Sequence, residues 1–390
     1  MRKHRIALIW KILFAIALGI ATGLFFPLSI VRIFETFNAL FSQFISFLVP
    51  LIIVGLVTPA IFRMGNGAGK MLFLTVVLAY ASTVMAGFFS YTISSSIFPT
   101  LLSKGDLGTS TMNANVVTPF FTINIPPMLD VMTALVFAFI CGIFLTFSKG
   151  EYLQKVFDDF EQIVLLTIGK VLIPLLPFYI YGIFLKMSFT GEAGPIVKVF
   201  SVVILIIFAI SVVWLLILFA VAGFISHKNP FKALGTMLTA YVTALATSSS
   251  AATIPITLQQ SVKCGVSHEV AGFTIPLCAT IHMPGSIIKI VACSITIMII
   301  QGMPFDLGLF SGFIFLLAIT MVAAPGVPGG AIMAAIGLMA SLLGFSEANQ
   351  ALIIAIYIVM DNFGTACNVT GDGAISLIVN RLSKIVTRDQ

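Results

Sequence analysis

Long apolar runs separated by short polar segments fill most of the 390-residue sequence. The hydrocarbon core of a bilayer is about 30 Å thick, so a helix needs roughly 20 apolar residues to cross it. Six runs with few or no charges approach or exceed that length and predict six conventional spans: residues 13–28, 36–62, 71–103, 113–148, 157–187 and 199–226. The pattern therefore predicts an all-α polytopic membrane protein.

Two further apolar runs, residues 233–262 and 307–346, are interrupted in the middle. The interruptions are a serine-rich segment, 247–255, and a segment of prolines and glycines, 324–330. Proline removes a backbone donor, glycine weakens a helix, and non-helical backbone inside a membrane needs surrounding protein or water. We therefore expect two re-entrant helical hairpins with their tips at these segments; two kinked helices are the alternative.

Each predicted hairpin is followed by another predicted span, residues 270–300 and 348–379. Two interrupted apolar segments in corresponding places are typical of a transporter's binding site. The expected fold is thus eight transmembrane helices plus two re-entrant hairpins.

Composition agrees with a membrane protein: 59% of the residues are hydrophobic and 9% are charged, against about 25% charged residues in soluble domains. Most lysines and arginines fall in loops on one side of the predicted spans, so the positive-inside rule places both termini in the cytoplasm. The net charge of +6 then reflects these loops, and we expect no nucleic-acid partner. The first apolar run lacks a cleavage pattern, so we expect a retained span of the inner cell membrane.

The five cysteines form no CxxC pair, and the sequence pattern offers neither a metal-ligand cluster nor a nucleophile paired with a base. We expect neither a disulfide framework nor a bound cofactor, and no enzymatic activity.

Ionisable residues inside apolar runs are costly and therefore mark functional sites. Asp361, Thr365, Asn368 and Asp372 are spaced by four, three and four residues, so they share one face of the last predicted helix. Such a face suits an ammonium group or a dehydrated Na⁺, because hard cations prefer oxygen ligands. A polar seam between helices is the alternative.

The preceding span carries His282 and Lys289 on one helix face, with Pro284 and Gly285 between them. The proline and glycine loosen the helix and free backbone carbonyls that can ligate a cation. We expect His282 to be a hydrogen-bonded packing residue, with a proton carrier as the alternative. Lys289 is expected to neutralise a carboxylate, with contact to a substrate anion or to a cavity as alternatives.

The serine-rich tip, the proline-glycine tip and the motif Asp361-x3-Thr365-x2-Asn368-Val-Thr-Gly-Asp372, in this order, resemble the dicarboxylate/amino acid:cation symporter family. That family contains glutamate and neutral amino acid transporters, and the resemblance covers nearly the whole chain. It implies a homotrimer held together by a scaffold domain, residues 1–67 and 109–190. It also implies a transport domain, residues 68–108 and 191–390, that moves as an elevator with the second hairpin as its extracellular gate.

The resemblance also implies roles for single residues. Asp361 would accept the substrate's amino group, and Asn368 with Ser249 and Ser250 would hold its α-carboxylate. The rest of the implied substrate pocket and gate is Ser286, Val327, Pro328, Gly329, Gly330, Gly364 and Thr365. The implied ligands of co-transported Na⁺, most of them through backbone carbonyls, are Cys278, Thr280, His282, Asn368 and Asp372.

The chain departs from the family pattern at informative positions. Members with acidic substrates have an arginine where this chain has Gly364, and without it a side-chain carboxylate would stay unpaired. An asparagine and an aspartate of a third Na⁺ site are replaced by His282 and Pro284, and Tyr357 takes a further acidic position. We expect that third site to be absent.

These observations predict uptake of a neutral, small amino acid coupled to Na⁺, with fewer ions than the acidic-substrate members use. The expected partners are the substrate, membrane lipid and the other copies of the homotrimer. One alternative is a proton-coupled carrier of a non-amino organic carboxylate, with Lys289 and His282 as coupling residues. An uncoupled channel or a sensor that does not transport is the other.

Overall fold

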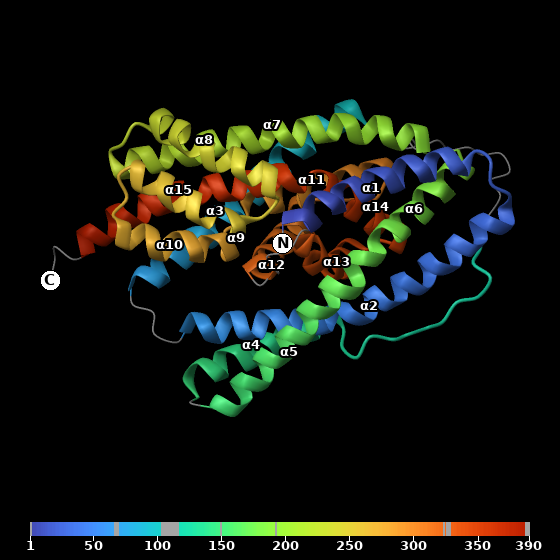
Figure 1. Ribbon diagram of the computed structural model, residues 1–390, viewed down its shortest axis with the longest axis horizontal. Coiled ribbons are helices and arrows are strands. Elements are labelled where there is room, and N and C mark those ends of the chain that lie inside the picture. The colour runs from blue at the N-terminus through green and yellow to red at the C-terminus, as the bar shows by residue number, and fades with distance from the viewer. Residues whose placement is uncertain are drawn as a thin grey trace.

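The computed structural model describes residues 2–65, 70–102, 117–148, 150–191, 193–322, 324 and 329–386. Within these ranges all regular secondary structure is helical, and most helices follow the long axis of the molecule (Figure 1). The prediction of an all-α protein is confirmed.

The first three predicted spans correspond to α1 (Arg2–Gly23), α2 (Leu28–Gly65) and α3 (Lys70–Leu101). The fifth is a continuous helical rod formed by α5 (Glu151–Thr167), a π-helical turn η1 (Ile168–Leu172) and α6 (Ile173–Phe189). The sixth is α7 (Ala193–Ser226).

The fourth predicted span, residues 113–148, was wrong in length. Its helix, α4, covers only Val131–Phe147, and residues 117–130 run without regular structure beside α2 (Figure 1). Prolines at 119, 126 and 127 oppose a helix there. The segment is fixed to α2, because the Thr118 carbonyl accepts a hydrogen bond from Arg32 Nε at 2.9 Å and the Phe120 N–H donates to Thr36 Oγ1 at 2.9 Å.

Each interrupted apolar run forms two short helices. The first pair, α8 (Pro230–Thr247) and α9 (Ser250–Lys263), packs together around a turn of two serines, and Ser248 has a left-handed backbone with φ of 49°. The second pair, α12 (Leu307–Val322) and α13 (Gly330–Leu343), also packs together. The tip between α12 and α13 includes residues 325–328, which lie outside the described residues.

The last two spans are both broken. One consists of α10 (His268–Ile281) and α11 (Pro284–Gln301), and the other of α14 (Glu347–Val359) and α15 (Asp361–Val386). Pro284 at the first position of α11 explains the first break, because proline cannot donate the hydrogen bond that would continue α10. The bend of 63° between α14 and α15 falls at Met360, and no proline or glycine at that position predicts it.

Five helices in the described part of the chain are long and apolar enough to cross a membrane, and the bent α14–α15 pair makes a sixth. None of the four hairpin helices is among them. The chain is therefore a polytopic membrane protein.

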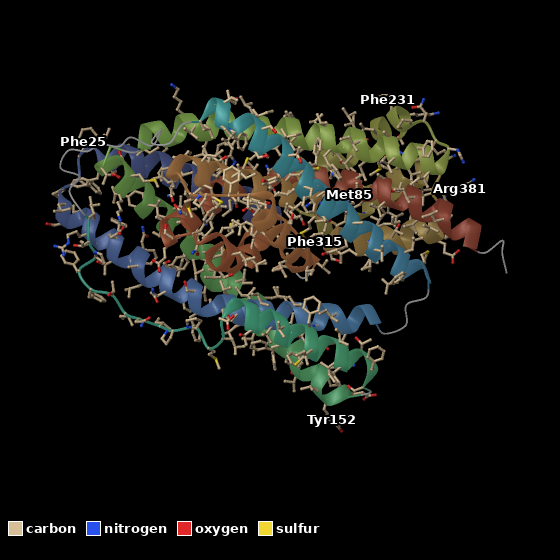
Figure 2. The ribbon with its side chains drawn as sticks, turned by 180° about the vertical axis from the view of Figure 1, so that it is seen from behind. Phe25, Met85, Tyr152, Phe231, Phe315 and Arg381 are labelled. Atoms are coloured by element: carbon tan, nitrogen blue, oxygen red, sulfur yellow. The ribbon has the colours of Figure 1, made fainter. Side chains whose placement is uncertain are left out.

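The core of the molecule is α11, which is mostly apolar and almost entirely buried. Helix α3 packs against α11 and α12 although it follows α2 in the chain, and α15 packs against α7, α8, α9, α10 and α11. Helices α1 and α6 pack against each other, and α4 and α5 pack on α2 and protrude from the rest (Figures 1 and 2). This packing brings the broken segments of α10–α11 and α14–α15 together in the interior.

Candidate functional site

Asp361, the first residue of α15, lies where the two broken spans meet. Its Oδ1 is 3.4 Å from Lys289 Nζ on α11, and its Oδ2 accepts a hydrogen bond from the Gly329 N–H at 3.3 Å. Gly329 is the N-cap of α13, so the amide end of that helix, which favours negative charge, faces the carboxylate. Asp361 is thus held between a buried cation and the second hairpin.

Lys289 is only 1% exposed and lies beneath the start of α15. Its Nζ is 3.7 Å from the centre of the Tyr357 ring, within cation–π distance. Its side chain also fills the space beside Gly364, because a Cβ at that position would overlap Lys289 Cε and Nζ. The expectation that Lys289 neutralises a carboxylate is confirmed, and a cation from α11 occupies the place that a side chain at 364 would take.

Asn368 joins α15 to the start of α11. Its Oδ1 accepts a hydrogen bond from the Gly285 N–H at 2.7 Å, and its Nδ2 donates to Ser286 Oγ at 3.2 Å. Ser286 Oγ also accepts a hydrogen bond from the Tyr357 hydroxyl at 3.1 Å. Thr365 lies one turn before Asn368 on α15 and is buried with it, so the predicted polar stripe does face the interior.

The first hairpin tip reaches the same place. Ser249 caps α9, since its Oγ accepts a hydrogen bond from the Ala252 N–H at 3.2 Å, and the Ser248 hydroxyl donates to Asn362 Oδ1 on α15. The first turn of α9, which begins at Ser250, retains backbone N–H groups that have no partner inside the helix. Such a helix start suits a carboxylate.

The second tip is described in part. Gly329 has a left-handed backbone with φ of 73°, a conformation that favours glycine, and Gly330 is buried at the start of α13. Val327 and Pro328, predicted to line the gate, lie outside the described residues.

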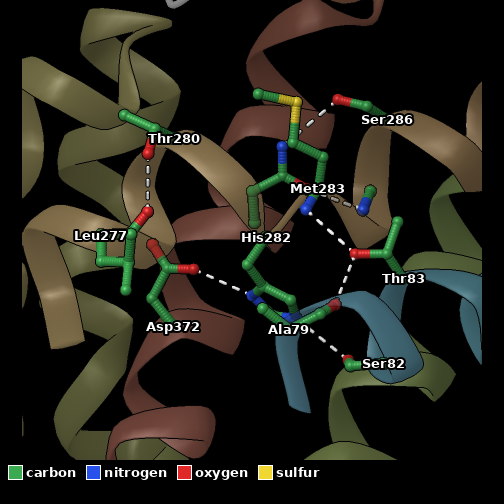
Figure 3. Close-up of polar contacts among 11 residues, drawn as sticks. Ala79, Ser82, Thr83, Leu277, Thr280, His282, Met283, Ser286 and Asp372 are labelled. Carbon is green, nitrogen blue, oxygen red and sulfur yellow. Dashed lines mark hydrogen bonds and ion pairs between the residues drawn. The ribbon is translucent and has the colours of Figure 1, made fainter. Parts of the chain in front are cut away.

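The other carboxylate of the stripe, Asp372, contacts the histidine at the break between α10 and α11 (Figure 3). His282 Nδ1 is 2.9 Å from Asp372 Oδ1, and His282 Nε2 is 2.9 Å from Ser82 Oγ on α3. Both side chains are essentially unexposed. His282 is therefore buried and hydrogen-bonded, and it connects α3 to α15. These contacts fit both a packing role and the alternative of a proton carrier.

Asp372 retains an unused oxygen: Oδ2 is buried and has no hydrogen-bond partner among the described residues. The Cys278 carbonyl accepts a hydrogen bond from the His282 N–H at 2.9 Å. The Thr280 hydroxyl donates to the Leu277 carbonyl at 2.7 Å (Figure 3). No group of three or more His, Cys, Asp or Glu side chains in the described ranges could hold a metal ion. Any cation here would depend on carbonyl and hydroxyl oxygens around one carboxylate.

The structure also assigns contacts that the sequence pattern did not predict. Ser82, Tyr357 and Asn362 face the site from α3, α14 and α15. Ser82 lies on α3, and the position of Tyr357 depends on the bend at Met360, which no neighbouring proline marks.

Comparison with known proteins agrees with this arrangement. A family model described as the sodium:dicarboxylate symporter family matches residues 8–382. The chain belongs to this family. Members of this family are transporters rather than enzymes.

Family relatives include transporters of different amino acids. The serine/threonine transporter SstT of Acinetobacter baumannii is 25% identical over 397 residues, which cover 97% of this chain and 98% of that protein. Excitatory amino acid transporter 1 of Rattus norvegicus is 30% identical over 249 residues, or 61% of this chain and 44% of that protein. Excitatory amino acid transporter 4 of Mus musculus is 27% identical over 242 residues, 60% of this chain and 42% of that protein. The chain thus spans less than half the length of the two excitatory transporters.

Proposed function

We propose that the protein is a symporter that takes up a small neutral amino acid, of the size of serine or threonine, together with Na⁺. The observation that carries the proposal is the position of Asp361, a buried carboxylate between two helix starts, with Gly364 one turn later in place of an arginine. SstT, which matches 97% of this chain, is a serine/threonine transporter, and this agrees with such a substrate.

In this proposal Asp361 binds the substrate's ammonium group. The α-carboxylate lies between the Asn368 amide and the start of α9 at Ser249 and Ser250, where amide N–H groups and a helix dipole favour a negative charge. The hydroxyls of Thr365 and Ser286 face the substrate's side chain, and Gly329 and Gly330 close the pocket.

Na⁺ is a second substrate. One ion is bound by Asp372 Oδ2, which is buried without a partner among the described residues and supplies the negative charge. The backbone carbonyls of Asn368 and His282 are the other ligands of this ion. Carbonyls of Cys278 and of the second hairpin, with Thr280, serve another ion. The groups fit a hard cation, because they are oxygen ligands.

The proposed architecture is an inner-membrane homotrimer of eight spans and two re-entrant hairpins, with both termini in the cytoplasm. Four features support it: the hairpin helices are short, α3 packs with the C-terminal half, α4 and α5 protrude, and Phe231 and Arg381 lie at the opposite end from Phe25 (Figure 2). Alternating access would arise by elevator movement of residues 68–108 and 191–390 against the scaffold, residues 1–67 and 109–190.

The test is uptake by proteoliposomes that contain the purified full chain. An inward Na⁺ gradient should drive accumulation of radiolabelled L-serine or L-threonine, whereas a K⁺ gradient should not. Asp361→Asn should lower uptake by at least about tenfold, because the variant cannot pair with an ammonium group. Full amino acid uptake by Asp361→Asn would contradict the assigned role, and saturable uptake without Na⁺ would contradict the coupling.

A second candidate is a proton-coupled carrier of a non-amino carboxylate. Two observations favour it: His282 bridges Asp372 and Ser82, and Asp361 already has a cationic partner in Lys289. It differs from the first proposal in requiring a pH gradient and no Na⁺, so the same vesicles with the two gradients imposed separately distinguish them.

A further inference from the structure

Lys289 lies against Asp361, the residue that the proposed function assigns to the substrate. Its ammonium pairs with Asp361 Oδ1 at 3.4 Å, which is the group assigned to the substrate's own ammonium. Lys289 is held in place by two further contacts: its Nζ lies 3.7 Å from the centre of the Tyr357 ring, and the end of its side chain fills the space beside Gly364.

The charges of Lys289 and Asp361 therefore cancel. A buried charge without a partner is costly inside a membrane, so neither Lys289 nor Asp361 can be left unpaired when a substrate enters. If the substrate's ammonium takes Asp361, the displaced lysine needs a new anion. A substrate with one positive and one negative charge brings that anion with it.

We propose that Lys289 is a specificity-determining residue: it holds Asp361 in the empty pocket and pairs with the substrate's carboxylate when the substrate's amino group takes Asp361. The inference rests on the proposed function, because it assumes that Asp361 receives an ammonium group. It adds that the pocket selects zwitterions by exchanging one ion pair for two.

Lys289 lies beside the stretch of α15 that carries both Asp361 and Asn368. The Lys289 ammonium lies beside Gly364, which on α15 is between Asp361 and Asn368. Asn368 contacts Ser286, one turn before Lys289 on α11, so a carboxylate near Asn368 is on the side of α11 that carries the lysine. A flexible four-carbon stem lets the ammonium shift between the two positions, and the Tyr357 ring stabilises it in between.

The experiment measures binding to the purified full chain in detergent at saturating Na⁺, by isothermal titration calorimetry. The probes are L-serine, 2-aminoethanol, which lacks the carboxylate, 3-hydroxypropanoate, which lacks the amino group, and L-aspartate, which has a second carboxylate. The wild-type chain should bind L-serine at least about tenfold more tightly than any of the other three.

The two charge-removing variants should shift this preference in opposite directions. Lys289→Met leaves Asp361 without its partner, so the affinity for 2-aminoethanol relative to L-serine should rise at least about tenfold. Asp361→Asn leaves Lys289 without its partner, so the relative affinity for 3-hydroxypropanoate should rise instead. A merely structural lysine would weaken all four probes alike.

The matched control is Lys170→Met, which makes the same change at an exposed lysine of η1 and should leave all four affinities unchanged. If Lys289→Met does not fold, Gly364→Ala provides a second test, because the added Cβ displaces the lysine without removing its charge. It should shift the preference in the same direction as Lys289→Met, by a smaller factor.

Three outcomes overturn the inference. An unchanged preference in folded Lys289→Met refutes the exchange while leaving serine uptake, and thus the proposed function, intact. Tighter wild-type binding of L-aspartate, lost in Lys289→Met, would instead pair the lysine with a side-chain carboxylate. Absence of both serine binding and serine uptake in the wild-type chain would refute the proposed function, and the inference with it.

Discussion

At the scale of single residues, the site depends on how closely α11 and α15 approach each other. A Cβ at Gly285 would lie 2.5 Å from the Gly364 carbonyl oxygen and 2.8 Å from Cys367 Cβ. This contact is what lets the Gly285 N–H reach Asn368 Oδ1 at 2.7 Å. Small residues at helix crossings serve the same purpose in membrane proteins generally.

Gly285→Ala should therefore destabilise the protein, by about 1–3 kcal/mol, since the added methyl group meets backbone and cannot be relieved by a rotamer change. Thermal unfolding in detergent measures the effect. The control is Gly272→Ala in α10, where an added Cβ meets nothing within 4 Å and alanine favours the helix. Equal unfolding temperatures for Gly285→Ala and the wild-type chain would contradict the close approach.

Asp372 supports a second prediction at this scale. Added Na⁺ should raise the unfolding temperature of the wild-type chain, and Asp372→Asn should reduce that rise, because the amide lacks the charge assigned to one of the two proposed ions. Asp306→Asn is the matched control: Asp306 is exposed and caps α12 by accepting the Leu309 N–H at 2.8 Å, a role that asparagine also fills. A Na⁺ response in Asp372→Asn as large as that of the wild-type chain would remove this carboxylate from the proposed site.

At the scale of elements, hydropathy predicted most helices, because crossing a bilayer requires long apolar runs and leaves few alternatives. It failed for residues 117–130, which belong to an apolar run but do not form a helix. Prolines oppose a helix there, and hydrogen bonds to Arg32 and Thr36 hold the segment in place. The bend at Met360 is set by packing between α14 and α15, and nothing in the local sequence marks it.

The functional site, like the helices, could be predicted from the sequence only in part. The stripe from Asp361 to Asp372 followed from helical periodicity, because all four residues lie on one helix. The contacts of Lys289 with Asp361, Gly364 and Tyr357 could not be derived, because they join three helices whose relative placement depends on the two breaks. Ser82 was missed for the same reason.

The re-entrant hairpins can be tested by labelling in whole cells with a membrane-impermeant maleimide, in a cysteine-free background. Cysteines at Phe231 and Lys263, at the two ends of the α8–α9 pair, should both label only after permeabilisation. Cysteines at Leu307 and Ala348, which flank the α12–α13 pair, should both label without it. Labelling of the two ends of one pair from opposite sides would mean that the pair crosses the membrane.

At the scale of the whole molecule, the chain has two unlike parts. The interior around α11 is closed on all sides, whereas α4 and α5 protrude and expose large apolar side chains, among them Phe144, Phe147 and Tyr152 (Figure 2). Lipid can cover such a surface, and so can another copy of the chain. The proposed homotrimer assigns the apolar face of α4 to contact between copies.

Native mass spectrometry of the detergent-solubilised chain should then give three times the mass of 41.8 kDa. Ile140 and Phe144 lie one turn apart on α4 and are 51% and 67% exposed, so Ile140→Ala/Phe144→Ala should shift the population to the single-chain mass. The expectation follows because helices in a membrane associate through close packing, which the smaller side chains remove. Val202→Ala/Leu205→Ala shortens two side chains on α7 that are 40% and 70% exposed, and it should leave the trimer intact. A wild-type chain at the single-chain mass would refute the trimer, and loss of trimer in the α7 variant alone would move the interface to that helix.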